Sequence, residues 1–345
     1  MNRKRTAVLL IYTGGTIGMV QDPKTKRLRP FDFNHLYDHV PELRKFDISI
    51  ATISFDKPID SSDMQPDKWV AMAEIIRDNY KKYDGFVILH GSDTMSFTAS
   101  ALSFMLENLS RPVILTGSQL PIGIIRTDGK ENLVTAIEIA AAKKNGRPVV
   151  PEVCVYFEYK LYRGNRTHKY NAEQFNAFQS ANFPELAEAG VHLRFDQRSI
   201  LKPSGRMLRV HTQLNTDIAI LKIFPGINRN VVRAVLNAKN LKAVVLESFG
   251  AGNATTQDWF ITELRQAIRK GIIIYNVTQC NAGAVEQGKY ETSAGLARIG
   301  VISGTDITTE AAVTKLMFLL GQKLSRKAIE KQLQRSLRGE LSEKA

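Results

Sequence analysis

The chain alternates short apolar runs, which are typical of buried β-strands, with longer segments whose apolar spacing is typical of helices. This alternation predicts an α/β fold built on a mostly parallel, doubly wound sheet. The first half has predicted strands at Ala7–Tyr12, Ile48–Ile53, Gly85–Leu89, Val113–Thr116 and Val153–Phe157, and predicted helices at Pro66–Lys82, Ser96–Leu109 and Lys130–Lys144.

Segment 194–213 interrupts the alternation, because it holds proline, glycine and charged residues without a sustained period. Beyond it we expect strands at Ile218–Phe224, Ala243–Leu246 and Ile272–Val277, and helices at Arg229–Lys239, Gln257–Arg269, Glu310–Leu320 and Ser325–Leu337. A length of 345 residues suits two domains. We predict a larger N-terminal catalytic domain at 1–193, a linker at 194–213 and a smaller C-terminal α/β domain at 214–345.

The net charge of +13 and pI of about 9.6 raise the question of a nucleic-acid partner. The basic residues are spread along the chain, and no zinc-finger spacing or RNP-like aromatic motif accompanies them. A solvated surface of mixed charge is the better explanation, so we expect no nucleic-acid partner.

The two cysteines, Cys154 and Cys280, lie in or just after apolar strand-like runs and are too far apart in sequence for a metal-binding spacing. We expect both to be free, buried thiols in a reducing compartment. The apolar run near the N-terminus is too short for a signal peptide, and no stretch is long enough to span a bilayer. These features predict a cytoplasmic protein without a membrane partner.

A glycine turn with a threonine on each side, Thr13-Gly14-Gly15-Thr16, follows the first predicted strand. The two glycines allow a sharp turn and a close approach of the backbone to a ligand. The turn could present a nucleophilic hydroxyl at the carboxyl end of a strand. Helix capping by the threonines is the alternative.

The predicted strand Gly85–Leu89 is followed by a second such turn, in which Ser92 and Asp93 stand together before a helix. Ligands of doubly wound sheets bind beyond the carboxyl ends of neighbouring strands. We therefore expect Thr16, Ser92 and Asp93 to face one crevice, although Ser92 or Asp93 could instead cap the helix.

Two further segments, Asp60–Met64 and Arg163–Lys169, complete the set of candidate site loops. The first contains Ser61 among residues that commonly cap helices, which is its alternative role. The second ends in Lys169, which could be an ordinary solvated lysine in a basic loop or could lie beside Asp93.

Together the four segments, which read TGGTIG, DSSDM, HGSDTM and RGNRTHK in this order, resemble the bacterial-type L-asparaginase family, and most closely its cytosolic type I members. The resemblance spans about Thr6 to Glu340 and includes FGAGN at Phe249–Asn253. Each motif is weak by itself, whereas the full set in this order is specific.

The resemblance implies hydrolysis of L-asparagine to L-aspartate and ammonia through a threonine acyl-enzyme. Thr16 is then the nucleophile, and Ser92, Lys169 and Asp93 form a relay that activates it or the attacking water. No metal or other cofactor is implied.

The resemblance also implies how the substrate is bound. Backbone N–H groups around Gly15 and Ser92 would form the oxyanion hole, and Asp93 would bind the α-ammonium group. Ser61 would bind the α-carboxylate, and its neighbour Asp60 would belong to the same substrate-binding set. Asn253 would complete the site of a neighbouring subunit in a homotetramer, a dimer of dimers with its sites at the intimate dimer interface.

The sequence departs from the family pattern near the nucleophile. Ser92 stands where the family usually has threonine, so the hydroxyl is kept while the methyl group that restricts χ1 is lost. The segment Met19–Arg29 lacks the tyrosine that many members use to bind the nucleophile. Tyr290 is our candidate replacement, and a packed or surface tyrosine is an equally good interpretation of it.

Some cytosolic relatives have a second, regulatory asparagine site, whose matching positions here are His168, Glu247 and Cys280. Glutamate at 247 replaces an arginine that would bind a carboxylate in a bidentate manner, and it adds repulsion. We therefore expect hyperbolic kinetics.

Two other functions stay open. One is the amidase of a tRNA-dependent amidotransferase, whose extra N-terminal domain we do not expect here because the glycine turn begins by Thr13. The other is a weakly catalytic asparagine-binding regulator, against which the presence of Thr16, Asp93 and Lys169 argues. The preference for asparagine or glutamine depends on one methylene group, which the sequence does not settle.

Overall fold

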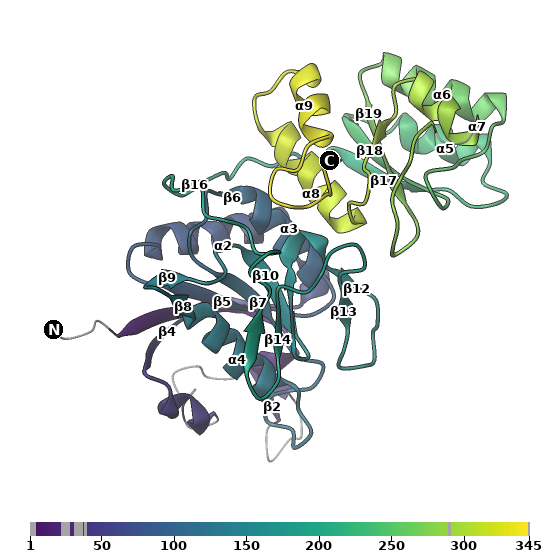
Figure 1. Cartoon of the computed structure of the whole chain (residues 1–345). Helices are drawn as coiled ribbons and strands as arrows, with labels where there is room; N and C mark the ends of the chain where they lie inside the picture. The colour runs from purple at the N-terminus through teal and green to yellow at the C-terminus, as the bar shows by residue number, and fades with distance from the viewer. Residues whose placement is uncertain (1–4, 22–27, 31–36, 38–39, 289–290, 344–345) are drawn as a thin grey trace. The chain divides into compact units, whose positions relative to one another are not determined.

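The computed structural model describes residues 5–21, 28–30, 37, 40–288 and 291–343. The chain divides into two compact units, one made of residues up to Ser180 together with Pro184–Thr212, the other of Ala181–Phe183 together with the chain from Gln213 onward (Figure 1). The predicted boundaries at 193 and 214 remain a prediction.

An eight-stranded sheet forms the first unit, in the order β15-β14-β11-β10-β7-β5-β1-β4. Five neighbouring strands, which pair in parallel, are the apolar runs predicted from the sequence: β4 (Ile48–Ile59), β1 (Thr6–Gly14), β5 (Gly85–Leu89), β7 (Val113–Thr116) and β10 (Val153–Phe157). Four of them are buried along nearly their whole length, as expected for strands covered on both faces.

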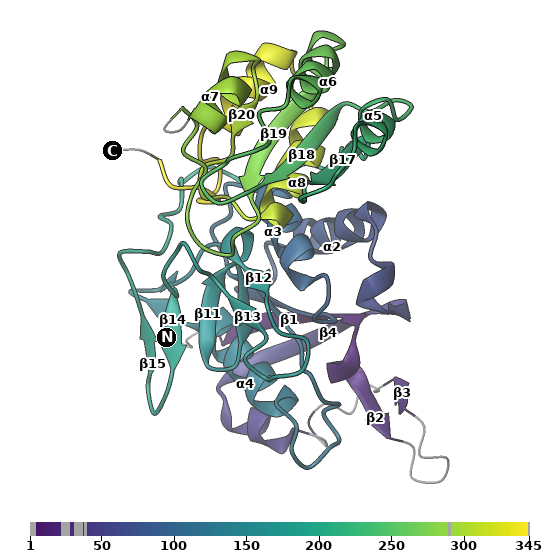
Figure 2. The ribbon, with the colours of Figure 1, turned by 90° about the vertical axis from the view of Figure 1, so that its right-hand side faces the viewer.

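Helices cover both faces of this sheet, with α2 (Pro66–Asn79) and α3 (Met95–Met105) on one face and α4 (Gly129–Ala141) on the other (Figures 1 and 2). The apolar stripe of α2 points inward, since Trp69, Met72, Ala73 and Ile76 are buried. The doubly wound, mostly parallel architecture predicted for the N-terminal region is therefore confirmed.

Three strands at one end of the sheet run antiparallel and were not predicted: β11 (Lys160–Arg163), β14 (Ala187–Ala189) and β15 (Leu193–Phe195). Figure 2 shows β14 and β15 as a hairpin. Five predicted helices end three or four residues earlier than expected, and beyond two of them the chain forms short strands instead. Residues Leu106–Glu107 form β6, which pairs with β16 (Arg209–Val210), and Lys143–Lys144 form β8, which pairs with β9 (Arg147–Pro148).

The second unit holds a four-stranded parallel sheet in the order β17-β18-β19-β20. Its strands are β17 (Ile218–Lys222), β18 (Ala243–Ser248), β19 (Ile273–Thr278) and β20 (Ile302–Ser303). Alternate side chains of β18 and β19 pack with α5 (Arg229–Leu236) and α6 (Asp258–Arg269) in one apolar core. This smaller α/β unit confirms the predicted class of the C-terminal region.

The remaining helices of the second unit are α7 (Glu291–Arg298), α8 (Thr309–Gly321) and α9 (Arg326–Leu333). Helix α8 is held to the C-terminal segment by Lys315 and Glu340, a fully buried ion pair with 2.6 Å between Nζ and Oε1. Lys315 Nζ also donates to the carbonyls of Leu333 and Arg335, so the buried ammonium group is satisfied.

Candidate active site

The two threonines of the glycine turn after β1 lie in different environments. Thr13 is buried and its hydroxyl donates to the carbonyl of Leu89 on β5 over 2.9 Å, so it joins two strands. Thr16 begins the short 3₁₀ helix η1 (Thr16–Gly18) and is partly exposed. Neither threonine caps η1, because its N-cap is Gly15 and no side chain makes a cap bond. Thr16 is therefore the more exposed of the two threonines, and helix capping does not account for it.

Close packing brings three turns of the first unit together. A Cβ atom on Gly15, whose φ is +87°, would lie 2.5 Å from the Gly91 nitrogen, and one on Gly91 would lie 2.5 Å from Ser61 Oγ. The hydroxyl of Thr94 donates to the Ser61 carbonyl over 2.7 Å. The turns after β1, β4 and β5 thus pack directly against one another, as expected for the carboxyl ends of adjacent parallel strands.

Lys169 contacts both side chains of the predicted relay. Its Nζ lies 2.8 Å from Ser92 Oγ and 2.6 Å from Asp93 Oδ1. The lysine side chain is only 15% exposed, whereas that of Asp93 is 65% exposed. The lysine is therefore held in the site, and the carboxylate remains accessible to a cationic ligand.

Buried contacts place Lys169 at this point. It lies in β12 (His168–Lys169), after a segment in which Arg163 forms a buried 2.7 Å ion pair with Glu152. The Thr167 hydroxyl returns to the Arg163 carbonyl over 2.8 Å. The alternative of a solvated basic loop does not fit a lysine anchored in this way.

Helix capping does not explain Ser92 or Asp93, since the N-cap of α3 is Thr94. In the Asp60–Ser61 turn, Ser61 is buried at the start of the 3₁₀ helix η4 (Ser61–Asp63), and Asp60 caps it by accepting the Ser62 N–H over 2.9 Å. The hydrogen bonds from Ser62 lower the pKa of Asp60. Asp60 thus has the predicted capping role, which also fixes the turn that holds Ser61.

Beneath the Ser92 turn lies His90, which is fully buried. Its Nδ1 is 2.6 Å from the Gly91 carbonyl and its Nε2 is 2.9 Å from the hydroxyl of Thr98. Burial lowers the pKa of His90 to about 4, so the ring is neutral near pH 7. It supports the turn and carries no charge into the site.

Several predicted residues belong to the second unit or lie outside the described residues. Asn253 belongs to the second unit, where it forms a β-bridge with Phe249. Tyr290 lies outside the described residues. Glu247, on β18, accepts a hydrogen bond from the Thr309 hydroxyl at 2.7 Å and pairs with Lys222 at 3.3 Å.

Both cysteines are free, as predicted, but only Cys154 is buried. The expectation of burial is wrong for Cys280, because it follows β19 in a turn rather than lying in the strand. The described residues contain no group of three or more potential metal ligands among His, Cys, Asp and Glu. No helix in the described ranges is long and apolar enough to cross a membrane.

Comparison with known families identifies both regions of the chain. The N-terminal asparaginase domain family matches residues 7–201, and the glutaminase/asparaginase C-terminal domain family matches residues 217–333. The chain belongs to the asparaginase family. This asparaginase-family chain is 43% identical to L-asparaginase 1 of Escherichia coli K12, over 98% of this chain and 99% of the relative.

Solved asparaginase structures share the fold. L-asparaginase I from Vibrio cholerae superposes with a TM-score of 0.88 at 41% identity, over 98% of this chain and 99% of that one. The thermostable L-asparaginase from Thermococcus kodakarensis gives a TM-score of 0.90 at 30% identity, over 98% and 100%. The resemblance to the type I members of the asparaginase family is thereby confirmed.

Gln119 is a site residue that the sequence did not reveal. It follows β7 in a third strand–glycine turn, and its Oε1 lies 3.3 Å from Ser92 Oγ. The strand followed by Gly117 was the available signal, because it repeats the pattern of the turns after β1 and β5.

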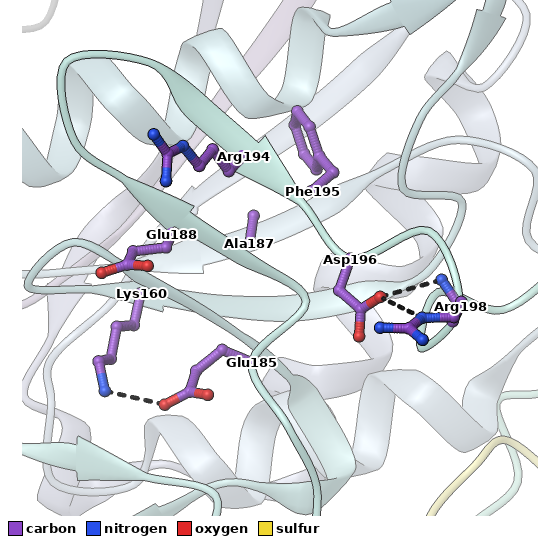
Figure 3. Close-up of a pocket in the computed structure, with 8 residues that line it drawn as sticks. All are labelled: Lys160, Glu185, Ala187, Glu188, Arg194, Phe195, Asp196 and Arg198. Atoms are coloured by element: carbon purple, nitrogen blue, oxygen red, sulfur yellow. Dashed lines mark hydrogen bonds and ion pairs between the residues drawn. The ribbon is translucent and has the colours of Figure 1, made fainter.

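A separate pocket of about 400 Å³ lies at the antiparallel end of the sheet (Figure 3). Two ion pairs lie among its charged side chains, Lys160 with Glu185 at 2.8 Å and Arg198 with Asp196 at 3.7 Å. None of the predicted site residues lines it, so we assign no chemistry to it.

Proposed function

We propose that the chain hydrolyses L-asparagine to L-aspartate and ammonia through an acyl-enzyme on Thr16. One observation carries the proposal. Lys169 Nζ contacts both Ser92 and Asp93, while the glycine turn that ends at Thr16 packs on Gly91, immediately before Ser92. The proposed nucleophile, Thr16, and the side chains that Lys169 contacts therefore lie on adjoining turns.

In the first half of the reaction, the Thr16 hydroxyl attacks the side-chain amide carbon, and the C–N bond breaks to release ammonia. Lys169 Nζ, whose N–H groups donate to Ser92 Oγ and Asp93 Oδ1, accepts the displaced proton, and the proton then passes to the leaving amine. Water next attacks the ester on Thr16 with the same relay as base, and aspartate leaves. Backbone N–H groups around Gly15 and Ser92 stabilise the oxyanion.

Substrate recognition uses polar groups of the same turns. The exposed Asp93 carboxylate binds the α-ammonium group, and the turn that Asp60 caps presents Ser61 to the α-carboxylate. The resemblance to the family supports a cytoplasmic homotetramer, a dimer of intimate dimers in which Asn253 completes a neighbouring site. Analytical ultracentrifugation would test the tetramer.

Steady-state ammonia release from L-asparagine, L-glutamine and D-asparagine tests the proposal. We expect turnover with L-asparagine to exceed that with D-asparagine, since Asp93 and Ser61 bind the two α-substituents in one handed arrangement. Glutamine adds one methylene group, for which discrimination of about 10- to 200-fold is usual. No ammonia release from any of the three amides would overturn the proposal.

A further inference from the structure

The side chain of Gln119 connects the proposed relay to the loop that follows Lys169. Its Oε1 faces Ser92 Oγ at 3.3 Å, while its Nε2 lies 3.2 Å from the Ala172 carbonyl and 3.0 Å from the Gln174 carbonyl. We propose that Gln119 is a positioning residue that fixes the direction of the Ser92 hydroxyl. This inference rests on the function proposed above.

Hydrogen-bond chemistry permits one orientation of the Gln119 amide. A backbone carbonyl can only accept, so both contacts with Ala172 and Gln174 require the amide NH₂ group. In the reversed orientation, Oε1 would face two carbonyl oxygens and all three groups would repel. The two carbonyls therefore fix the amide and direct its oxygen toward Ser92.

The fixed amide in turn fixes the serine hydroxyl. An amide oxygen carries no hydrogen, so the hydroxyl of Ser92 must donate to Gln119 Oε1. The lone pairs of Ser92 Oγ are then left for Lys169 Nζ at 2.8 Å. A threonine at this position would restrict χ1 through its methyl group, and a serine lacks that restriction. The hydrogen bond to Gln119 restricts the Ser92 side chain in place of the missing methyl group.

The backbone of Gln119 is itself held firmly. Its N–H lies 2.9 Å from one carboxylate oxygen of the buried Asp128, and the next N–H, of Leu120, lies 3.1 Å from the other. A Cβ atom on Gly117 would lie 2.4 Å from the His90 carbonyl, so the turn after β7 packs directly on the turn that carries Ser92. These contacts fix the position of the Gln119 backbone.

The test replaces Gln119 by methionine, which keeps the length of the side chain and can neither accept from Ser92 nor donate to the loop as an amide does. We expect Gln119→Met to lower kcat for L-asparagine about tenfold, the size of one lost hydrogen bond. KM should stay within about twofold, because the relay serves the chemical step.

A matched control is Gln322→Met in the second unit. Gln322 Nε2 donates to the carbonyls of Gln213 and Phe318, both at 3.2 Å, so this variant loses the same kind of contact without removing any bond to a relay residue. We expect its kcat and KM to match those of the wild type. Thermal unfolding of both variants checks that each folds.

A double-mutant cycle distinguishes positioning from a merely structural role. In a Ser92→Ala background, Gln119→Met should cause no further loss of kcat, because the hydroxyl that it orients is absent. In the Gln119→Met background, Ser92→Thr should restore most of the activity. Wild-type kcat in Gln119→Met, or an equal loss with and without the Ser92 hydroxyl, would overturn the inference alone. An inactive wild type would overturn the proposed function as well.

Discussion

Lys169 Nζ donates a hydrogen bond to Ser92 Oγ across 2.8 Å, although the two residues stand 77 positions apart in the chain. The contact joins the turn after β5 to the short strand β12. In the proposed relay, serine stands where we expect threonine in the family, so this relay would depend on a hydroxyl with fewer constraints on its side chain.

Removing the Ser92 hydroxyl should disable this relay. We expect Ser92→Ala to lower kcat about 100-fold or more, as usual for the loss of positioned proton transfer. The comparison is Ser110→Ala, which removes a partly buried hydroxyl 3.0 Å from Tyr80 Oη in the same unit. Steady-state ammonia release measures both variants, and near-normal turnover in Ser92→Ala would show that Ser92 has no part in the relay.

The close approach of Gly15 to Gly91 should make Gly15 intolerant of any side chain. Gly15→Ala would place a Cβ atom 2.5 Å from the Gly91 nitrogen at a φ of +87°. We expect a loss of about 3 kcal/mol in the free energy of unfolding, from the clash and the backbone strain together. Denaturant unfolding measures it.

Gly146→Ala separates these two causes. Gly146 has a φ of +76°, but a Cβ atom there would meet nothing within 4 Å. Only the strain remains, so we expect a loss of about 1 kcal/mol. Equal losses in the two alanine variants would show that the close packing of the Gly15 turn does not contribute to the free energy of unfolding.

How much of this arrangement the sequence predicts depends on the kind of signal. Four of the five parallel strands, β1, β5, β7 and β10, were predictable because continuous apolar runs mark strands buried on both faces. The antiparallel strands β11, β14 and β15 are short, and polar residues break their pattern. Helix α3 ends at Met105 although the apolar run continues, because Leu106–Glu107 pairs with β16 from a distant segment.

In the site too, the sequence predicted the residues that a motif marks and did not predict the residue that is placed by distant contacts. The motifs of the family placed Ser92, Asp93 and Lys169 in one cluster, and the structure brings them together. Gln119 was not predicted, because no sequence motif marks an amide as a site residue. Its proposed positioning role follows from contacts with Ala172 and Gln174, which lie more than 50 positions away in the chain. The choice of Thr16 over Thr13 gains support from the bond that Thr13 makes to Leu89.

Acid should weaken the second unit through Glu263. Hydrogen bonds from Arg233 and Arg229 lower the pKa of this carboxyl to about 2. A pKa lowered by folding gives stability that is present above the unfolded-state value of about 4.3 and is lost as the pH falls toward 2. Because the arginines are half exposed, we expect only about 1 kcal/mol.

Glu263→Gln should remove that contribution at pH 7 and flatten the dependence of stability on pH between about 5 and 2. The control is Glu330→Gln, which loses an exposed i,i+4 pair with Arg326 on α9. Chemical denaturation across this pH range compares them. An unchanged pH profile in Glu263→Gln would mean that its ion pairs do not stabilise the fold.

The rate of ammonia release should depend hyperbolically on L-asparagine concentration, with a Hill coefficient of about 1. Glu247 occupies the position where a regulatory site would need a cation, and its carboxylate is already engaged with Lys222 and Thr309. Initial rates over a wide range of substrate concentrations test this. A clearly sigmoidal curve would contradict it.

The central claim, that Thr16 is the nucleophile, is tested most directly by comparing ammonia release from L-asparagine in Thr16→Ala and Thr13→Val at equal concentrations of folded protein. Thr13→Val loses only the structural bond to Leu89, so we expect its kcat to stay within about threefold of the wild type and its thermal stability to fall. We expect Thr16→Ala to fold normally and to lose about 1,000-fold or more in kcat. Near-wild-type ammonia release from Thr16→Ala would contradict the account.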